Sequence, residues 1–300
     1  MMKERTGMFE LTLPSPFYQL KSLSLLWGVD LWVKRDDLIP QFYGGNKTRK
    51  NRAIFKKYFE QNGIPDVVIT NGGVNSNHAR VVALMAKQLG CPCELVLHGQ
   101  EPLIDIPTNL LIAKIAGARH HIVQPSGIRG KIEELCEEYK SLGKRCFVIP
   151  GGAHTPEAAM AYEKAVQELT FAPDYIVHAS GTGGTQAGLL RGIFKNNLET
   201  QLMGISVARN SQRGVAAINP LLDGCSITEE SIRFFDEFTF GGYGCTTEEL
   251  TNFVQTVIAT EGMPLDEIYT GKAMYGLHEL VKSREIEKGS QVVFWHTGGV

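Results

Sequence analysis

Short apolar runs alternate with segments of helical periodicity along most of this 300-residue chain. Residues 67–69 form one such run, and the helical segment 75–89 follows it and stops at Gly90. Strands that alternate with helices predict an α/β architecture. Several runs are continuously apolar, as expected for strands that are covered on both faces. We therefore expect two domains built from open, twisted, mostly parallel sheets with helices on both faces.

The same pattern predicts the remaining elements. Further strands are expected at residues 31–33, 94–97, 121–123, 146–149, 175–179, 202–207 and 292–295, and further helices at 17–27, 109–116, 132–142, 156–169, 186–194 and 271–281. One more helix should follow Lys47 and stop at Gly63. The last third of the chain, from Leu202 on, is less regular.

Composition excludes several classes of protein. The formal net charge is -2 and the two signs are interspersed, so no basic stripe points to nucleic acid. No apolar run approaches the roughly 20 residues that cross a bilayer. Residues 1–16 lack the apolar core of a signal peptide. We expect a cytoplasmic protein that binds neither nucleic acid nor membrane.

Six cysteines are present, most of them in apolar, strand-like or helix-like surroundings. This setting indicates buried, reduced thiols. Cys91 and Cys93 flank a proline and could form half of a metal site. No second Cys or His pair follows at zinc-finger spacing, so we predict no metal site.

Two glycines and a lysine stand at the expected start of a helix, in the sequence Gly44-Gly45-Asn46-Lys47. Glycine lets a loop approach a ligand closely. A lysine that is held at a helix N-terminus and partly dehydrated has a lowered pKa and can form an imine with an aldehyde. The alternative is a solvated basic helix face, because Lys50 and three further basic residues follow.

The sequence Ser180-Gly181-Thr182-Gly183-Gly184-Thr185 follows an expected strand and opens an expected helix. Backbone N–H groups at such a turn, together with the helix dipole, can bind a phosphate group. No lysine follows as in a Walker loop, and the glycine spacing differs from the dinucleotide pattern. One phosphate monoester fits better than a nucleotide. The alternative is an ordinary glycine-rich turn.

A second polar segment, residues 71–78, follows the strand 67–69 and opens the next helix. Ser76 and Asn77 offer side-chain donors beside free backbone N–H groups, which suits a carboxylate. Asn75 or Ser76 can cap the helix at the same time. His78 is either a buried structural histidine or a catalytic group. Both polar segments follow strands, where ligands bind in parallel sheets.

Three shorter motifs complete the set: Tyr269-Thr270-Gly271-Lys272-Ala273-Met274, His296-Thr297-Gly298-Gly299 and Gly241-Gly242-Tyr243-Gly244. Each alone could be a loop or a helix cap. Together, and in this order from Trp32 to Thr297, the motifs resemble one family of pyridoxal-phosphate enzymes. It has the tryptophan-synthase-β fold (fold type II), in the branch of 1-aminocyclopropane-1-carboxylate (ACC) deaminase and D-cysteine desulfhydrase.

The resemblance implies pyridoxal 5'-phosphate as cofactor, a small amino acid as substrate, and a role for each site residue. Lys47 would carry the cofactor as an imine and move the substrate Cα proton. Tyr269 would lie against the cofactor ring, Thr297 would approach its pyridine nitrogen, and Asn77 would bond its phenolic oxygen. The phosphate would be held by Gly181, Thr182, Gly183, Gly184 and Thr185. The substrate, with its carboxylate on Ser76, would be bound by Ser76, Asn77, His78 and Tyr243.

Two positions separate the activities within this branch. The deaminases carry Glu directly after the tyrosine and Leu at the position of Thr297, whereas this chain has Thr270 and Thr297. Both differences favour β-elimination from D-cysteine or a related amino acid, giving pyruvate, ammonia and sulfide. The alternatives are ACC deamination to 2-oxobutyrate, a lyase reaction on another small amino acid such as cysteate, β-replacement, and a non-catalytic ligand-binding protein.

The expected architecture is a larger domain from residues 1–46 and 162–300 and a smaller domain from 47–161. The cofactor would lie in the crevice between them. The resemblance also implies a homodimer. Members of this branch usually continue past Gly299 with another helix, whereas this sequence ends at Val300. We expect either that a shorter C-terminus is natural for this protein or that its active site is less covered than in other members of the branch.

Overall fold

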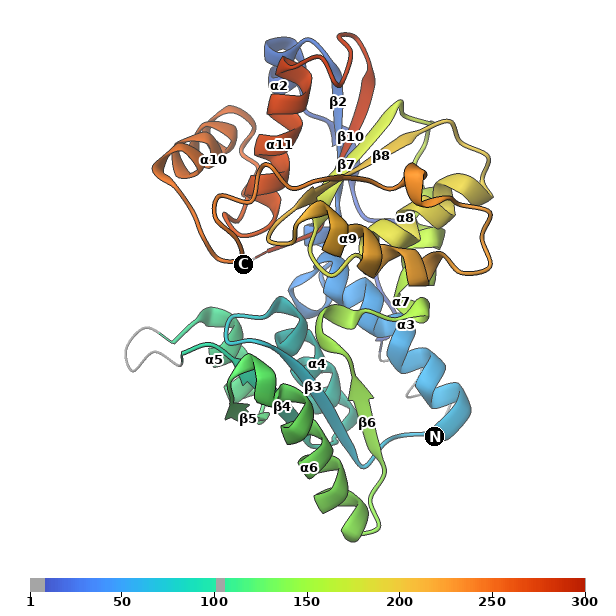
Figure 1. Cartoon of the computed structure of the whole chain (residues 1–300), viewed down its shortest axis with the longest axis vertical. Coiled ribbons are helices and arrows are strands. Elements are labelled where there is room, and N and C mark those ends of the chain that lie inside the picture. The colour runs from blue at the N-terminus through green and yellow to red at the C-terminus, as the bar shows by residue number, and fades with distance from the viewer. Residues whose placement is uncertain (1–8, 101–105, 300) are drawn as a thin grey trace.

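The computed structural model describes residues 9–100 and 106–299, which form two lobes, each built on one sheet (Figure 1). The strands of the larger sheet are β1 (Phe17–Gln19), β2 (Asp30–Arg35), β7 (Tyr175–Ser180), β8 (Gln201–Ser206), β9 (Arg233–Phe235) and β10 (Gln291–His296). The strands of the smaller sheet are β3 (Val67–Gly73), β4 (Cys93–His98), β5 (Arg119–Ile122) and β6 (Cys146–Ile149).

The helices that connect these strands are α2 (Lys21–Trp27), α3 (Gly45–Asn62), α4 (Asn77–Leu89), α5 (Thr108–Ile115), α6 (Ile128–Ser141), α7 (Pro156–Ala165), α8 (Gly184–Lys195), α9 (Ser211–Ile218), α10 (Glu248–Glu261) and α11 (Thr270–Lys282). The strand order is β1-β2-β10-β7-β8-β9 in the larger sheet and β5-β4-β3-β6 in the smaller. Every neighbouring pair is parallel except β1 with β2.

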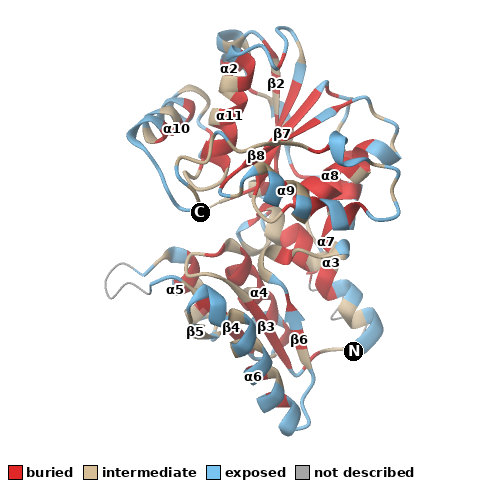
Figure 2. Cartoon of the chain, viewed as in Figure 1, coloured by how far each residue is buried: buried red, intermediate tan, exposed pale blue. Residues whose placement is uncertain are grey.

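Helices cover both faces of each sheet, which confirms the predicted α/β class. One core of the larger lobe joins the sheet to α2, α10 and α11, and another joins its opposite face to α7 and α8. In the smaller lobe, α3, α4 and α5 pack on one face and α6 on the other. Figure 2 shows the consequence: α8 is mostly buried, whereas α6 and α10 present exposed faces.

The domain boundaries remain a prediction. The strands of the smaller sheet lie within residues 67–149, and those of the larger sheet lie before residue 36 and after residue 174. Between the lobes, α3 packs against both α4 and α7, and α7 packs against α8 (Figure 1). These two helices therefore contact both lobes.

The predicted helix at 17–27 is wrong in its first part. Phe17, Tyr18 and Gln19 form β1, which pairs antiparallel with residues 32–34 of β2, and only Lys21–Trp27 is helical. The Phe17 ring lies 5.3 Å from that of Trp32 and 5.5 Å from that of Phe171. These are contacts with distant parts of the chain, and local periodicity does not reveal them.

The irregular last third contains three elements that periodicity did not predict. Thr247 caps α10 by accepting a hydrogen bond from the Leu250 backbone N–H. Asn210 caps α9 in the same way through Arg213 N–H. The third element, β9, is a strand of three half-buried residues at the edge of the sheet. It is too short and too exposed to show the continuous apolar run that marked the other strands.

The cysteines are less buried than expected. All six are free thiols, but only Cys93 is buried, and Cys245 is exposed. Within residues 9–100 and 106–299, no helix has the length and apolar character to cross a membrane.

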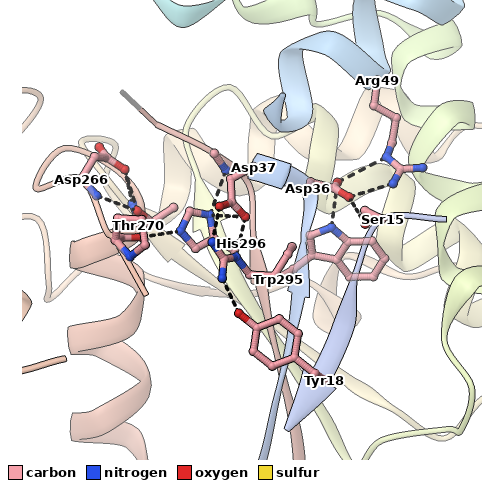
Figure 3. A network of polar contacts seen from close by, with 12 residues as sticks. Ser15, Tyr18, Asp36, Asp37, Arg49, Asp266, Thr270, Trp295 and His296 are labelled. Carbon is pink, nitrogen blue, oxygen red and sulfur yellow. Dashed lines mark hydrogen bonds and ion pairs between the residues drawn. The ribbon is translucent and has the colours of Figure 1, made fainter. Parts of the chain in front are cut away.

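A buried carboxylate joins α3 to the larger sheet. Asp36, directly after β2, accepts hydrogen bonds from Arg49 on α3 (2.7 Å), Tyr162 on α7 (2.6 Å) and the Trp295 indole on β10 (2.9 Å). Figure 3 shows Asp36 between Arg49 and Trp295, with Ser15 beside it. Burial raises the pKa of Asp36, but the Arg49 charge and these hydrogen bonds outweigh it and hold the pKa at about 2. The carboxylate is therefore ionised and fixes the start of α3 against β2 and β10.

We predict that Asp36→Asn lowers the free energy of unfolding by about 3–5 kcal/mol at pH 7, because Arg49 loses a buried ionic partner. An unfolded aspartate has a pKa of about 3.9. The contribution is therefore complete above that pH and is lost as the pH falls towards 2. Denaturant unfolding against pH measures both effects. The exposed control Asp223→Asn should change stability by less than about 0.5 kcal/mol. Equal stability of Asp36→Asn and wild type would contradict this role.

Candidate active site

A cavity of about 520 Å³ lies where the carboxyl ends of strands from both sheets meet. Its wall includes the first turn of α3 and the segments that follow β3, β6, β7, β8 and β10. Of the residues predicted for the site, these line it: Lys47, Ser76, Asn77, His78, Gly181, Thr182, Gly183, Thr185, Tyr243, Tyr269 and Thr297. Gly184 is the exception; its backbone lies in the first turn of α8.

Lys47 enters the cavity from a strained loop. Phe42, Tyr43, Gly44 and Gly45 all have left-handed φ angles, at 55°, 61°, 64° and 79°. A Cβ on Gly44 would lie 2.4 Å from the Asp37 carbonyl oxygen, and one on Gly45 would lie 2.8 Å from that of Thr297. Only glycine fits at both positions. The loop therefore turns sharply and starts α3 with Lys47 in its first turn.

The Lys47 side chain is half-buried at the wall of the cavity. Burial lowers its pKa from 10.5 to about 8, and its Nζ donates a long hydrogen bond, 3.3 Å, to the Gly152 carbonyl. A substantial part of the amine is then neutral near pH 8 and can act as a nucleophile.

Asn46 joins the predicted phosphate loop to the Lys47 loop. Its Nδ2 donates to Thr185 Oγ1 at 3.1 Å, and its backbone N–H donates to the Thr297 carbonyl at 2.8 Å. Gly183 has a φ of 88°, and a Cβ there would lie 2.7 Å from Ile218 Cγ1. The turn is therefore tight, and its backbone N–H groups lie at the start of α8.

Lys50 is a site residue that the sequence did not reveal. It is 1% exposed and its Nζ donates to Gly152 O at 2.8 Å. A Cβ on Gly184 would lie 3.0 Å from this Nζ, so the Lys50 amino group is next to the phosphate loop. Burial, and then the charge of Lys47, put its pKa well below the usual value. The alternative of a solvated basic face is wrong for Lys50, which is buried three residues after Lys47, whereas Lys56 and Lys57 are exposed as that alternative predicts.

The cavity wall carries basic groups without acidic ones. Lys47, Lys50, Arg80 and Arg209 line it, and no Asp or Glu does among the residues that the structure describes. Such a site favours anions. In the same described residues, no group of three or more His, Cys, Asp or Glu side chains could hold a metal ion.

The Asn77 side-chain amide has a fixed orientation. Its Oδ1 accepts hydrogen bonds from Arg80 Nη1 at 3.0 Å and from Asn109 Nδ2 at 3.2 Å. Arg80 is 2% exposed, and its guanidinium also contacts the Tyr43 ring at 5.5 Å. With the oxygen occupied, the Asn77 NH₂ group is the part that can donate to a ligand.

Ser76 caps α4 and can still bind a ligand. Its Oγ accepts from the Ala79 backbone N–H at 3.2 Å, which leaves the hydroxyl hydrogen free to donate. A Cβ on Gly72 would lie 2.7 Å from this Oγ. The strand end therefore approaches the cap closely because residue 72 is glycine.

His78 has partners at both ring nitrogens. Asn51 Nδ2 donates to Nδ1 at 3.1 Å, so Nε2 carries the proton and donates to Thr70 Oγ1 at 2.8 Å. Burial and the nearby Lys47 and Lys50 charges put the His78 pKa well below its usual value. Neutral His78 thus supports Asn51, which also donates to the Lys47 carbonyl. No ring nitrogen is left for a substrate in this arrangement.

Tyr243 and Tyr269 form a hydroxyl pair at the cavity. Their oxygens are 2.9 Å apart and their rings are nearly perpendicular, at 73°. Asp266 fixes Tyr269 by accepting from its backbone N–H at 2.8 Å. Burial, and then the nearby Tyr243, put the pKa of Tyr269 well above its usual value, so the Tyr269 hydroxyl is protonated at neutral pH.

The two threonines that the resemblance links to the choice of activity have different surroundings. Thr270 is fully buried, and its Oγ1 donates to Asp266 Oδ1 at 2.7 Å, so it belongs to the start of α11 (Figure 3). Thr297 lines the cavity. Only Thr297 is therefore in position to contact a ligand directly.

Comparison with known proteins defines the class. A family described as "Pyridoxal-phosphate dependent enzyme" matches residues 8–298, so the chain belongs to it. Within it, the chain belongs to the family of ACC deaminase and D-cysteine desulfhydrase, which confirms the resemblance.

Named relatives support this placement. A protein of Pyrococcus abyssi named "Putative 1-aminocyclopropane-1-carboxylate deaminase" is 36% identical over 302 residues, which cover 95% of this chain and 89% of that protein. The "Bifunctional D-cysteine desulfhydrase/1-aminocyclopropane-1-carboxylate deaminase, mitochondrial" of Arabidopsis thaliana is 31% identical over 309 residues. These cover 96% of this chain and 77% of that protein.

A solved structure described as "the ACC deaminase homologue" superposes with a TM-score of 0.87 at 34% identity. The superposition covers 100% of this chain and 94% of the chain in that structure. A fungal L-serine ammonia-lyase from Rhizomucor miehei has a TM-score of 0.70 at 15% identity, and this likeness shows the fold alone.

The cavity fits pyridoxal 5'-phosphate, the cofactor of this family. Lys50 and the turn before α8 offer a cation and N–H groups to its phosphate, and the Lys47 amine can bond to its aldehyde carbon. The excess of basic groups suits the phosphate together with a substrate carboxylate. The chain is therefore a pyridoxal-phosphate-dependent enzyme, and the roles of individual residues remain predictions.

We predict that Lys50→Met weakens binding of pyridoxal phosphate by about 10²-fold, because a buried cation that pairs with an anion contributes a few kcal/mol. Absorbance titration of the apoprotein measures the affinity. Pyridoxal, which has no phosphate, should bind the variant and the wild type about equally. The exposed residue Lys56 on the same helix supplies the control Lys56→Met, with no expected change. An equal loss for pyridoxal and its phosphate would argue against a phosphate contact.

We also predict that the rate at which the apoprotein attaches the cofactor rises with pH and levels off above about 8, because only the neutral Lys47 amine can react. Stopped-flow absorbance at several pH values measures this rate, with Lys47→Ala as the blank. A rate that continues to rise to about pH 10, as for a free lysine, would contradict the lowered pKa.

Proposed function

We propose that this enzyme catalyses β-elimination of D-cysteine or a closely related amino acid. One D-cysteine and one water give pyruvate, ammonia and sulfide. The C–S bond breaks and sulfur leaves with its electron pair, the Cα proton is removed, and water replaces the amino nitrogen in the product. Bound pyridoxal phosphate supplies the electron sink for the negative charge at Cα.

The chain's own residues have separate tasks in this reaction. The Ser76 hydroxyl and the backbone N–H groups at the start of α4 bind the substrate carboxylate, as a helix N-terminus favours. The Lys47 amine takes the Cα proton. The Tyr243–Tyr269 hydroxyl pair, within the same cavity, is available to donate a proton to the leaving sulfur.

The observation that carries the proposal is the absence of a carboxylate from the described cavity wall, together with the Thr297 hydroxyl. In the resemblance, Thr297 is the residue at the pyridine nitrogen, where a neutral hydroxyl does not favour ring protonation. A milder electron sink suits rapid loss of a β-leaving group without extended charge build-up. Thr270 adds less support than expected, because its hydroxyl is bonded to Asp266.

ACC deamination to 2-oxobutyrate and ammonia is the second candidate, because relatives in three Pyrococcus species carry that name. The hydroxyl pair of Tyr243 and Tyr269 also favours it, since ring opening needs a proton donor at a substrate carbon.

Product analysis of the purified holoenzyme with D-cysteine, L-cysteine, cysteate and ACC distinguishes these reactions. We expect sulfide and pyruvate from D-cysteine and no 2-oxobutyrate from ACC. Turnover of ACC as the preferred substrate would overturn the proposal, and sulfite from cysteate would move it to a different leaving group.

We predict that Thr297→Glu slows the elimination by about tenfold or more, which is about 1.4 kcal/mol in the barrier, because a carboxylate would favour a protonated ring. The absorbance spectrum of the bound cofactor should change in parallel. Thr297→Ser keeps the hydroxyl and should retain nearly the wild-type rate. An unchanged rate in Thr297→Glu would remove the argument from the pyridine nitrogen.

A further inference from the structure

Lys272 is a buried cation that the reaction does not use. Its side chain is fully buried, and its Nζ donates to the carbonyls of Thr239 (2.7 Å), Gly242 (2.7 Å) and Val207 (3.3 Å). Within the described part of the chain, no carboxylate forms an ion pair with it. An ammonium has three donors and no acceptor, so three carbonyl oxygens match its protonated form.

The position of Lys272 on its helix does not explain it. It is the third residue of α11, where the positive end of the helix dipole disfavours a cation. Burial also lowers its pKa. A buried charge in an unfavourable place is kept only where its contacts compensate, and here these contacts are the three carbonyls.

The three carbonyls belong to segments that surround the cavity. Val207 follows β8 and lines the cavity wall. Thr239 and Gly242 lie in the segment that leads to Tyr243. The Tyr243 residue is 46% exposed. Apart from the bond between the Tyr243 and Tyr269 hydroxyls, the side chain of Tyr243 has little support from packing.

The backbone of this segment is not held by regular structure. Phe240, Gly241, Gly242 and Gly244 all have left-handed φ angles, at 52°, 95°, 126° and 75°. Two backbone hydrogen bonds form turns here: Gly242 N–H donates to the Thr239 carbonyl at 3.0 Å, and Cys245 N–H donates to the Gly242 carbonyl at 3.3 Å. The Phe240 ring packs on Tyr275 of α11 with ring centroids 5.0 Å apart, but the glycine backbone on either side of Tyr243 would be mobile unless another group fixed it.

We infer that the Lys272 ammonium acts as an internal monovalent cation, coordinated by three backbone carbonyls, that holds residues 239–243 against α11. Lys272 is thus a positioning residue for the Tyr243–Tyr269 hydroxyl pair. It does not touch the substrate or the cofactor. The inference that Lys272 positions the hydroxyl pair for catalysis rests on the proposed role of Tyr243. The inference that Lys272 holds residues 239–243 against α11 does not.

Hydrogen exchange of the apoprotein tests the structural part without cofactor or substrate. Lys272→Met keeps the apolar stem and removes the charge. We expect amide exchange in residues 239–246 to be about tenfold faster, the loss expected for hydrogen bonds from a charged donor. Exchange in β4 and in the remainder of α11 should not change. Lys282→Met, an exposed position on the same helix, should match wild type. Unchanged exchange in 239–246, or faster exchange throughout the larger lobe, would overturn the inference.

Chemical rescue distinguishes a cation site from simple packing. Lys272→Ala leaves three carbonyls around a space that a small monovalent cation can enter. We expect 0.1 M potassium or ammonium chloride, on the order of physiological ionic strength, to restore protection of residues 239–246, and the larger tetramethylammonium ion not to restore it. Equal effects of all three salts would contradict a specific cation site.

Kinetics then test the positioning role. For Lys272→Met with D-cysteine, we expect the KM to rise about tenfold and kcat to fall, with the cofactor affinity and its absorbance spectrum unchanged. If D-cysteine is not a substrate, the exchange and rescue results still stand, and the proposed function alone fails. Wild-type kinetics in a variant with faster loop exchange would show that the loop position does not matter for catalysis.

Discussion

The contact between the Asp36 carboxylate and the Arg49 guanidinium is the interaction on which the site depends. Lys47 is two residues before Arg49, so the ion pair fixes the first turn of α3, and with it the reactive amine, against the ends of β2 and β10. Glu168 adds a second acceptor for Arg49 at 2.6 Å. A lysine on an unattached helix could not keep a defined distance from ligands held by the other lobe.

Charge is the second organising feature of the molecule. Away from the cavity, Arg49 pairs with Asp36 and Arg191 pairs with Glu163, whereas Lys272 is coordinated by backbone carbonyls. At the cavity, Lys47, Lys50 and Arg80 are buried or lie at the wall without carboxylate partners within the described residues. Unpaired buried charge is costly without a ligand. Burial accordingly lowers the pKa values of Lys47 and Lys50 in the apoprotein, and an anionic ligand would favour the protonated form of Lys50, which couples binding to stability.

The sequence predicted what local chemistry determines. The α/β alternation, the two glycines before Lys47 and the turn before α8 are local patterns, and the structure has them at the expected strand ends. It did not predict β1, because that strand exists only through pairing with β2. The sequence left Lys50 on a possible solvated helix face and gave Lys272 no role of its own, because the burial of both depends on elements distant in the chain. The role of Thr270 was likewise hidden by its partner Asp266.

The central claim is that Lys47, held by this arrangement, is the residue that bonds to the cofactor. Reduction of the holoenzyme with borohydride, followed by peptide mass spectrometry, tests it most directly. Lys47 and Lys50 lie in one segment and both contact the Gly152 carbonyl, so fragment ions must separate them. The account predicts a pyridoxyl-phosphate adduct on Lys47 and none on Lys50. An adduct on Lys50, or on a lysine outside the cavity, would contradict it.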